Sequence, residues 1–228
     1  MATNSFPQSR SPWFTTVEGC QIWDSRPVAG ESASWSGACV GGFGEGQGET
    51  VWKLPSQPVA NGRGVIADAS GLRLDQILDG EMHHGRYQGH LVMRVYEKDT
   101  GKLDHTITGN MVDENFEGAG SLKSADGWQY IGEFHLGMKD GHGVTVYPTG
   151  ARYEGNFHYG SWEGPGRLTW GSDNSYVGSF YMGLPEGPGE ALLRVSGRQD
   201  APQVDLKGTW IAGCLTDSTP RRCIIFKT

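Results

Sequence analysis

A ladder of glycines at fixed offsets from an aromatic residue recurs along this chain and constrains its fold more than any other feature. Counting from Tyr130, glycines follow at +2, +7, +11 and +13, and the same four offsets follow Tyr153, Tyr176 and Trp35. The three tyrosines are spaced by 23 residues. Such regularity indicates an array built from one small structural unit. In the two central copies these glycines are Gly132, Gly137, Gly141 and Gly143, and Gly155, Gly160, Gly164 and Gly166.

Weaker copies of the ladder begin at Leu78, Ile107 and Leu206. The Ile107 copy keeps the 23-residue phase, but Glu114 stands at its +7 position. We therefore expect about seven repeats, each contacting mainly its neighbours.

The repeats define the expected domain organisation. The array covers residues 35–215 and is interrupted by insertions, the first of which keeps traces of a degraded copy. A 1–34 extension with a cap strand precedes the array, and a 216–228 cap follows it. The insertions lie near 53–77, 92–104 and 194–204.

One repeat reads as a β-hairpin. Residues two apart in a strand share a face, so offsets 0, +2 and +4 place a ring, a glycine and a ring together, as in Tyr130-Gly132-Phe134. A neighbouring ring can lie across the side-chain-free glycine. The +7 glycine falls where the chain must reverse, and glycine readily takes positive φ. The pattern predicts an all-β fold: an elongated, single-layer antiparallel meander of stacked hairpins with little helix.

The motif Tyr-x-Gly-x-Phe-x-x-Gly-x-x-x-Gly-x-Gly resembles the core of the MORN (membrane occupation and recognition nexus) repeat, most strongly over 130–190. The resemblance implies a role as a scaffold or docking platform, since MORN proteins serve in this way, and some were proposed to bind phospholipids. Others accompany a catalytic domain such as a lipid kinase; because only about 34 and 13 residues lie outside the array, we expect no second domain here. The segment from Gly19-Cys20 to Cys39 also resembles bacterial exported MORN proteins, which implies the periplasm or cell envelope.

The ring-bearing side of the sheet is the expected binding face. Exposed apolar patches usually mark binding sites, and a partner helix or extended segment could lie along this one. The alternative is that the rings cover only one another. Pairing of the terminal repeats between two copies would give a homodimer. The expected face consists of Trp35, Tyr130, Phe134, Tyr153, Phe157, Tyr176 and Phe180.

The charge of the chain argues against two classes of partner. Its formal net charge is −7, whereas nucleic-acid binding draws on clustered lysine and arginine. The same balance weakens attraction to anionic membranes, so a lipid surface is the less favoured alternative. No apolar stretch approaches the roughly 18–20 residues that span a bilayer. The polar opening shows no signal-peptide pattern, which leaves a cytoplasmic protein or a mature exported one.

The four cysteines lie near the two ends of the array, at Cys20, Cys39, Cys214 and Cys223. Pairing Cys20 with Cys39 and Cys214 with Cys223 would staple the two ends that fray first. Four cysteines allow three connectivities, so this pairing is a choice among them. Their placement favours an oxidising compartment; the alternative is four free thiols in the cytosol.

Features typical of catalysis or of a cofactor are weak, so we expect no enzyme, no cofactor and no metal. His83, His84 and His90 are the best metal candidates, but adjacent strand residues point to opposite faces. His142 occupies a repeat position. Acidic residues recur on the strands, and paired carboxylates can hydrolyse glycosides, so a carbohydrate-active enzyme is the least favoured alternative. A single-layer sheet, however, offers no deep pocket to raise a carboxyl pKa. The acidic residues considered are Glu133, Glu154, Glu163, Glu186 and Glu190, with Asp113, Glu114 and Glu117 as a weak calcium candidate.

Overall fold

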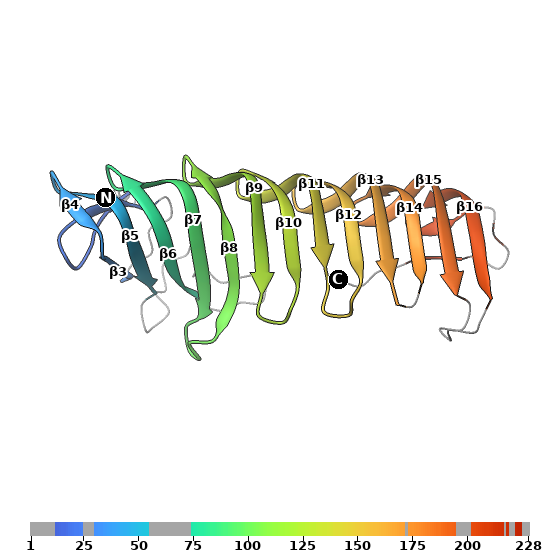
Figure 1. The fold of residues 1–228 in the computed structure, drawn as a ribbon, viewed down its shortest axis with the longest axis horizontal. Helices are drawn as coiled ribbons and strands as arrows, with labels where there is room; N and C mark the ends of the chain where they lie inside the picture. Colours follow the sequence, from blue (N-terminus) through green and yellow to red (C-terminus); the bar gives the residue numbers. More distant parts are fainter. Residues whose placement is uncertain are drawn as a thin grey trace, which may run out of the picture. The chain divides into compact units, whose positions relative to one another are not determined.

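The computed structural model describes residues 12–24, 30–54, 74–171, 173–194, 202–216, 218 and 222–224. Over these residues the chain consists of β-strands and turns, and successive long strands run antiparallel (Figure 1). The all-β meander predicted from the repeat is therefore confirmed. None of the described segments forms a helix that could cross a membrane. The chain divides into two compact units, 1–106 with 111–114 and 107–110 with 115–228.

In the first unit a meander of long strands carries a small N-terminal assembly. β5, β6 and β7 pair antiparallel in sequence order, and β3 and β4 both pair with β5. The N-terminal extension supplies β1 and β2, which pair with each other, and Gln21 of β2 pairs with Phe43 of β5. The strands are β1 (Trp13–Thr15), β2 (Gln21–Trp23), β3 (Ser32–Trp35), β4 (Ala38–Val40), β5 (Phe43–Lys53), β6 (Leu74–His83) and β7 (Arg86–Glu97).

The second unit repeats one hairpin along the chain. From β9 to β16 each strand pairs antiparallel with the next. β8 (Leu103–Val112) divides its residues between the two units. The other strands are β9 (Asn115–Ser124), β10 (Gln129–His135), β11 (Met138–Val146), β12 (Arg152–His158), β13 (Ser161–Trp170), β14 (Asn174–Tyr181), β15 (Leu184–Arg194), β16 (Gln203–Ile211) and β17 (Cys214–Leu215).

Glycines of the second unit form one continuous row across the strands. The +2 glycine of each hairpin lies directly opposite its +13 glycine, and that glycine lies opposite the +2 glycine of the next hairpin. A Cβ atom at Gly143 would lie 2.5 Å from the Tyr130 ring, so the ring rests on the backbone. The predicted packing of rings on glycine is thus confirmed. This glycine row comprises Gly120, Gly132, Gly143, Gly155, Gly166, Gly178, Gly189 and Gly208.

The +7 and +11 glycines have a different role, because both have positive φ. At +7, Gly137 (φ 75°) and Gly160 (φ 85°) end two-residue turns whose first residue is also left-handed. At +11, Gly141 (φ 91°) and Gly164 (φ 80°) lie where the strand register shifts. The first set closes the hairpin, as predicted; the second forms a β-bulge that bends the strand, which the sequence did not indicate.

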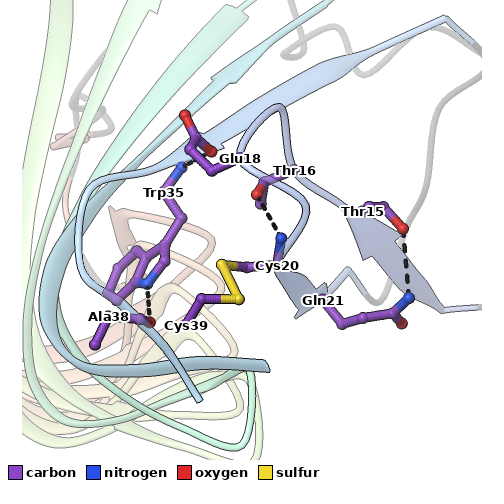
Figure 2. The surroundings of a disulfide bond; sticks show 8 residues. All are labelled: Thr15, Thr16, Glu18, Cys20, Gln21, Trp35, Ala38 and Cys39. Carbon is purple, nitrogen blue, oxygen red and sulfur yellow. Dashed lines mark hydrogen bonds between the residues drawn. A yellow bond between two sulfur atoms is a disulfide. The ribbon is translucent and has the colours of Figure 1, made fainter. Parts of the chain in front are cut away.

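Both disulfides have the connectivity favoured from the sequence. Cys20 and Cys39 join the loop between β1 and β2 to β4, with their Cα atoms 5.7 Å apart (Figure 2). Beside them the Trp35 backbone N–H donates to Glu18 Oε2 at 2.9 Å, and the Trp35 indole donates to the Ala38 carbonyl at 2.9 Å. Cys214 and Cys223, with Cα atoms 3.9 Å apart, close the other end of the chain.

Of the three segments expected to be insertions, the structure describes only 92–104 in full. Residues 92–104 are mostly strand, because β7 continues to Glu97 and β8 begins at Leu103; the Glu97 N–H donates to the Lys102 carbonyl across the turn. Most of the 53–77 insertion, with its degraded copy, lies outside the described residues. So does the greater part of 194–204.

Glu114 occupies the turn position that is glycine in most other copies, at φ 67°. Burial raises the pKa of its carboxyl to about 7, against the lowering effect of Arg86, whose Nη1 lies 3.6 Å from Glu114 Oε1. We expect Glu114→Gly to stabilise the protein at pH 8 by roughly 1 kcal/mol, because it removes both a left-handed non-glycine residue and a desolvated charge. Urea denaturation of the variant and the wild type measures this.

The pH dependence separates the two contributions at Glu114. The folded-state pKa lies above the ordinary value of 4.5, so the folded state favours the protonated carboxyl. Its contribution to stability is fully present below pH 4.5 and declines as the pH rises through about 7. Glu114→Gln should therefore gain stability relative to the wild type over this range while keeping the backbone strain. A constant difference between the two from pH 4 to pH 8 would contradict a desolvated carboxyl.

Candidate functional site

The aromatic rings expected to form an exposed binding face are buried. Each is at most 5% exposed, and Tyr130, Tyr153 and Tyr176 are 0% exposed. The six rings of the second unit pack edge to face on one another; Tyr153 and Phe157, for example, have ring centroids 5.2 Å apart, whereas Trp35 meets Tyr87 edge to face. The alternative, that the rings cover one another, describes this packing. A partner must therefore contact other residues, and binding by this set stays a prediction that their burial does not favour. The set is Trp35, Tyr130, Phe134, Tyr153, Phe157, Tyr176 and Phe180.

A pocket of about 530 Å³ opens in the second unit, which is within the usual range for ligand sites. One part of its wall comes from the loops that link successive hairpins, and the other part comes from the hairpin turns. These two sets of residues lie at opposite ends of the strands, so the strands must curve to bring them around one hollow. The lining residues are Asp126, Trp128, Lys139, Tyr147, Pro148, Thr149, Gly160, Ser161, Trp162, Met182 and Gly183.

Lys139 is the exceptional residue of this pocket, because it stands at a core position of the repeat. It is the +9 residue of its hairpin, and the +9 residue of the next hairpin is Trp162, which is only 5% exposed. Other +9 positions are also apolar and buried, namely Tyr87, Phe116, Pro185 and Leu215. The glycine ladder does not point to Lys139, but an alignment of the copies at +9 would have revealed a lysine in an otherwise apolar column.

The Lys139 ammonium lies among aromatic rings. Its nitrogen is 4.8 Å from the Trp128 ring centroid, 5.4 Å from that of Phe157 and 5.7 Å from that of Tyr130. Burial lowers the pKa of Lys139. Within the described residues it forms no ion pair, and the ring faces offset only part of the lost hydration. Such a site favours an incoming anion.

The walls around Lys139 are aromatic and firmly held. Trp162 stacks on Tyr153, with ring centroids 4.3 Å apart and planes 6° from parallel. Tyr147 meets the Trp162 ring edge to face, with centroids 6.3 Å apart. Burial raises the pKa of Tyr147, partly offset by a hydrogen bond with the Trp128 side chain. Asp126, the acidic residue of the lining, accepts hydrogen bonds from its own loop, from Trp128 N at 3.1 Å and Ser124 Oγ at 2.6 Å. The pocket thus combines flat apolar walls with one half-buried cation.

Four carboxylates at +10 have a repeated structural role, which we call the carboxylate latch. Each accepts the N–H of the first turn residue of a neighbouring hairpin, and in three latches a histidine just before that residue also contacts the carboxylate. The turn N–H and then the imidazole lower the pKa of Glu45, Glu117 and Asp140. The pairs are His84 N–Glu45 (2.8 Å), Leu136 N–Glu117 (2.8 Å), Tyr159 N–Asp140 (3.2 Å) and Ala212 N–Glu186 (2.8 Å).

The paired histidines lie close to one carboxylate, so the expectation that they point to opposite faces of a strand is wrong. The physical reason is that β6 ends at His83, and His84 lies in the turn with φ 50°. Both imidazoles therefore approach Glu45. His90 belongs to β7 and is not part of this cluster.

Four of the remaining carboxylate candidates have local partners. Glu154 pairs with Arg152 at 2.6 Å and Glu190 with Lys207 at 3.2 Å. Of the three residues weighed as a calcium site, Glu114 faces Arg86, whereas Glu117 holds the turn at Leu136. These carboxylates contact neighbouring backbone groups or cations.

A comparison with protein families matches the MORN repeat over residues 130–152, 153–175 and 176–191. The matched segments begin at Tyr130, Tyr153 and Tyr176, so they have the phase of the glycine ladder. No curated protein matches the chain in sequence.

Proposed function

We propose that this chain, whose residues 130–191 are MORN repeats, is a non-catalytic scaffold that binds a protein segment in the pocket around Lys139. The observation that carries this proposal is a lysine at a core position, held among rings and left without a carboxylate among the described residues. A carboxylate of the partner would pair with the Lys139 ammonium, and charge-assisted hydrogen bonds of this kind are stronger than those between neutral groups.

The expected occupant is an acidic side chain next to an apolar or aromatic one, in a helical or extended segment. Trp128, Tyr147 and Trp162 offer flat surfaces, and Met182, 70% exposed at the rim, adds adaptable apolar contact. The backbone N–H and C=O groups of the strands around the pocket are largely paired within the meander, so we assign recognition to side chains.

The compartment we propose is the bacterial periplasm or cell envelope, with the cytoplasm as the alternative. Two disulfides are compatible with an oxidising compartment, where such bonds persist. A thiol-trapping assay on the chain in its native cells would distinguish the two, because cytosolic chains would carry four reactive thiols.

The proposal predicts a loss of binding on replacing Lys139. We would pan a library of random 12-residue peptides on the folded chain and measure the selected peptides by calorimetry. We expect enrichment of aspartate or glutamate beside aromatic residues, and at least 10-fold weaker binding to Lys139→Met, since a hydrogen bond to a charged group contributes roughly 1.5–3 kcal/mol. Trp128→Ala should weaken binding as well.

Lys123→Met is the matched control, because it removes the same charge from an exposed position on β9. Selected peptides that bind Lys139→Met and the wild type equally would overturn the assignment of the pocket. Sedimentation with anionic vesicles at low and high salt, in the absence of any selected peptide, would instead favour the lipid-surface role. Detected hydrolysis of a cell-wall sugar that is lost in Glu163→Gln would contradict a non-catalytic protein.

A further inference from the structure

Three side chains with metal-binding atoms converge at the hairpin turn between β6 and β7. His83 Nδ1 lies 2.6 Å from Glu45 Oε1, and His84 Nδ1 lies 3.8 Å from Glu45 Oε2. One donor atom from each of the three residues lies within 4.8 Å of the other two. All three belong to the first unit, so the cluster forms within one compact body.

The turn geometry explains why two consecutive histidines face the same carboxylate. His83 is the last residue of β6, whereas the left-handed conformation of His84 redirects its side chain. The His84 N–H donates to Glu45 Oε2 at 2.8 Å, which fixes the backbone. The His84 ring stacks on Phe43, with centroids 5.4 Å apart and planes 16° from parallel, which limits the orientations of the imidazole.

The second unit contains two natural comparisons for this cluster. His135 contacts Glu117 at 3.1 Å and His158 contacts Asp140 at 3.0 Å, in the same arrangement as His83 and Glu45. The residue after the histidine is Leu136 in one case and Tyr159 in the other. A carboxylate with one histidine thus suffices for the latch, and His84 adds a third donor that the latch does not need.

We propose that Glu45, His83 and His84 bind a divalent transition-metal ion of the zinc class. Imidazole nitrogen and carboxylate oxygen are the donors that such ions take, and two histidines with one glutamate form a known three-ligand set. Two donors bound to one tetrahedral Zn²⁺ at about 2.0–2.1 Å lie roughly 3.3 Å apart. The His83–Glu45 contact of 2.6 Å must therefore open and the wider spacings, up to 4.8 Å, must shorten. The His83 and His84 side chains are 65% and 75% exposed, so small rotations can make both adjustments. Three protein ligands leave at least one position for water or an outside ligand.

The test is calorimetric titration of the untagged, metal-free chain with ZnCl₂ in a non-chelating buffer, supported by the visible spectrum of the Co²⁺ form. We expect one zinc per chain. His84→Leu should weaken binding at least 10-fold, because it leaves two donors, and leucine already occupies the equivalent turn position at Leu136. The four cysteines are paired in disulfides and do not compete. Circular dichroism would show that the variant folds.

Two further variants make the result specific. His135→Asn with His158→Asn removes the imidazole from the two other latches that contain one and should leave zinc binding unchanged. Leu136→His places a third donor beside Glu117 and His135, and should raise the stoichiometry from one to two. Absence of saturable binding to the wild type, or equal binding by His84→Leu, would overturn the site.

Discussion

Replacing Gly155 with alanine is expected to destabilise the protein by roughly 3 kcal/mol or more, the upper end of the range for overpacked cores. A Cβ atom there would lie 2.6 Å from the Gly166 Cα, 2.7 Å from the Pro165 carbonyl oxygen and 2.6 Å from the Tyr153 hydroxyl. Two of these three neighbours are backbone atoms of the paired strand, which cannot move without breaking the ladder. Urea denaturation followed by tryptophan fluorescence measures the change.

Gly160→Ala separates this steric effect from the conformational freedom of glycine. Gly160 has φ 85°, but no atom lies within 4 Å of its missing Cβ. Its replacement should therefore cost only about 1 kcal/mol, the penalty for a left-handed alanine. Equal losses for the two variants would show that the glycine row serves backbone conformation and not the approach of strands and rings.

The repeat ladder predicts so much of the fold because glycine at +2 and +13 leaves few alternatives. Both glycines must share the face of the ring at offset 0, and only a paired hairpin brings them opposite each other, as Gly132 and Gly143 are. The +7 glycine fixes the turn. The buried rings follow from the same parity, since a ring lying on glycine backbone has one of its faces covered already.

The sequence could not reveal the site in the same way, because curvature depends on small shifts in backbone geometry. The +11 glycines lie at register shifts of the kind that bend a strand, and Trp128 and Gly160, from opposite ends of the strands, line one pocket. Alternation along a strand indicates which side chains share a face and not how far neighbouring rings cover one another, so it predicted a binding face formed by rings that are in fact buried. It likewise predicted that His83 and His84 belong to one strand, although the strand ends between them.

Replacing Tyr153 with leucine is expected to cost roughly 3 kcal/mol or more, near the range for truncating a buried aromatic residue. The ring is 0% exposed, stacks on Trp162 and meets Phe180 edge to face at 5.1 Å. Beneath it lie glycines with no side chains to fill the void, and paired strands cannot close it. Tyr153→Phe, which loses only the hydroxyl donated to the Asn156 carbonyl at 2.9 Å, should cost about 1 kcal/mol.

The first unit covers its strand glycine with leucines in place of a tyrosine ring, which predicts that a second substitution can compensate for the loss of Tyr153. There Leu78 takes the ring position, and Leu91 replaces the +13 glycine and fills the space over Gly80. At Gly166 the three atoms nearest to a missing Cβ all belong to the Tyr153 ring and hydroxyl. Gly166→Leu alone should therefore be severely destabilising, because its side chain overlaps the Tyr153 ring. In the double variant with Tyr153→Leu that ring is gone, so the loss of unfolding free energy should be smaller than the sum of the losses in the two single variants. A double-mutant cycle in urea should give a favourable coupling of roughly 1–3 kcal/mol. Additive losses would mean that ring and glycine do not occupy one shared space, and the packing unit of the repeat would need another explanation.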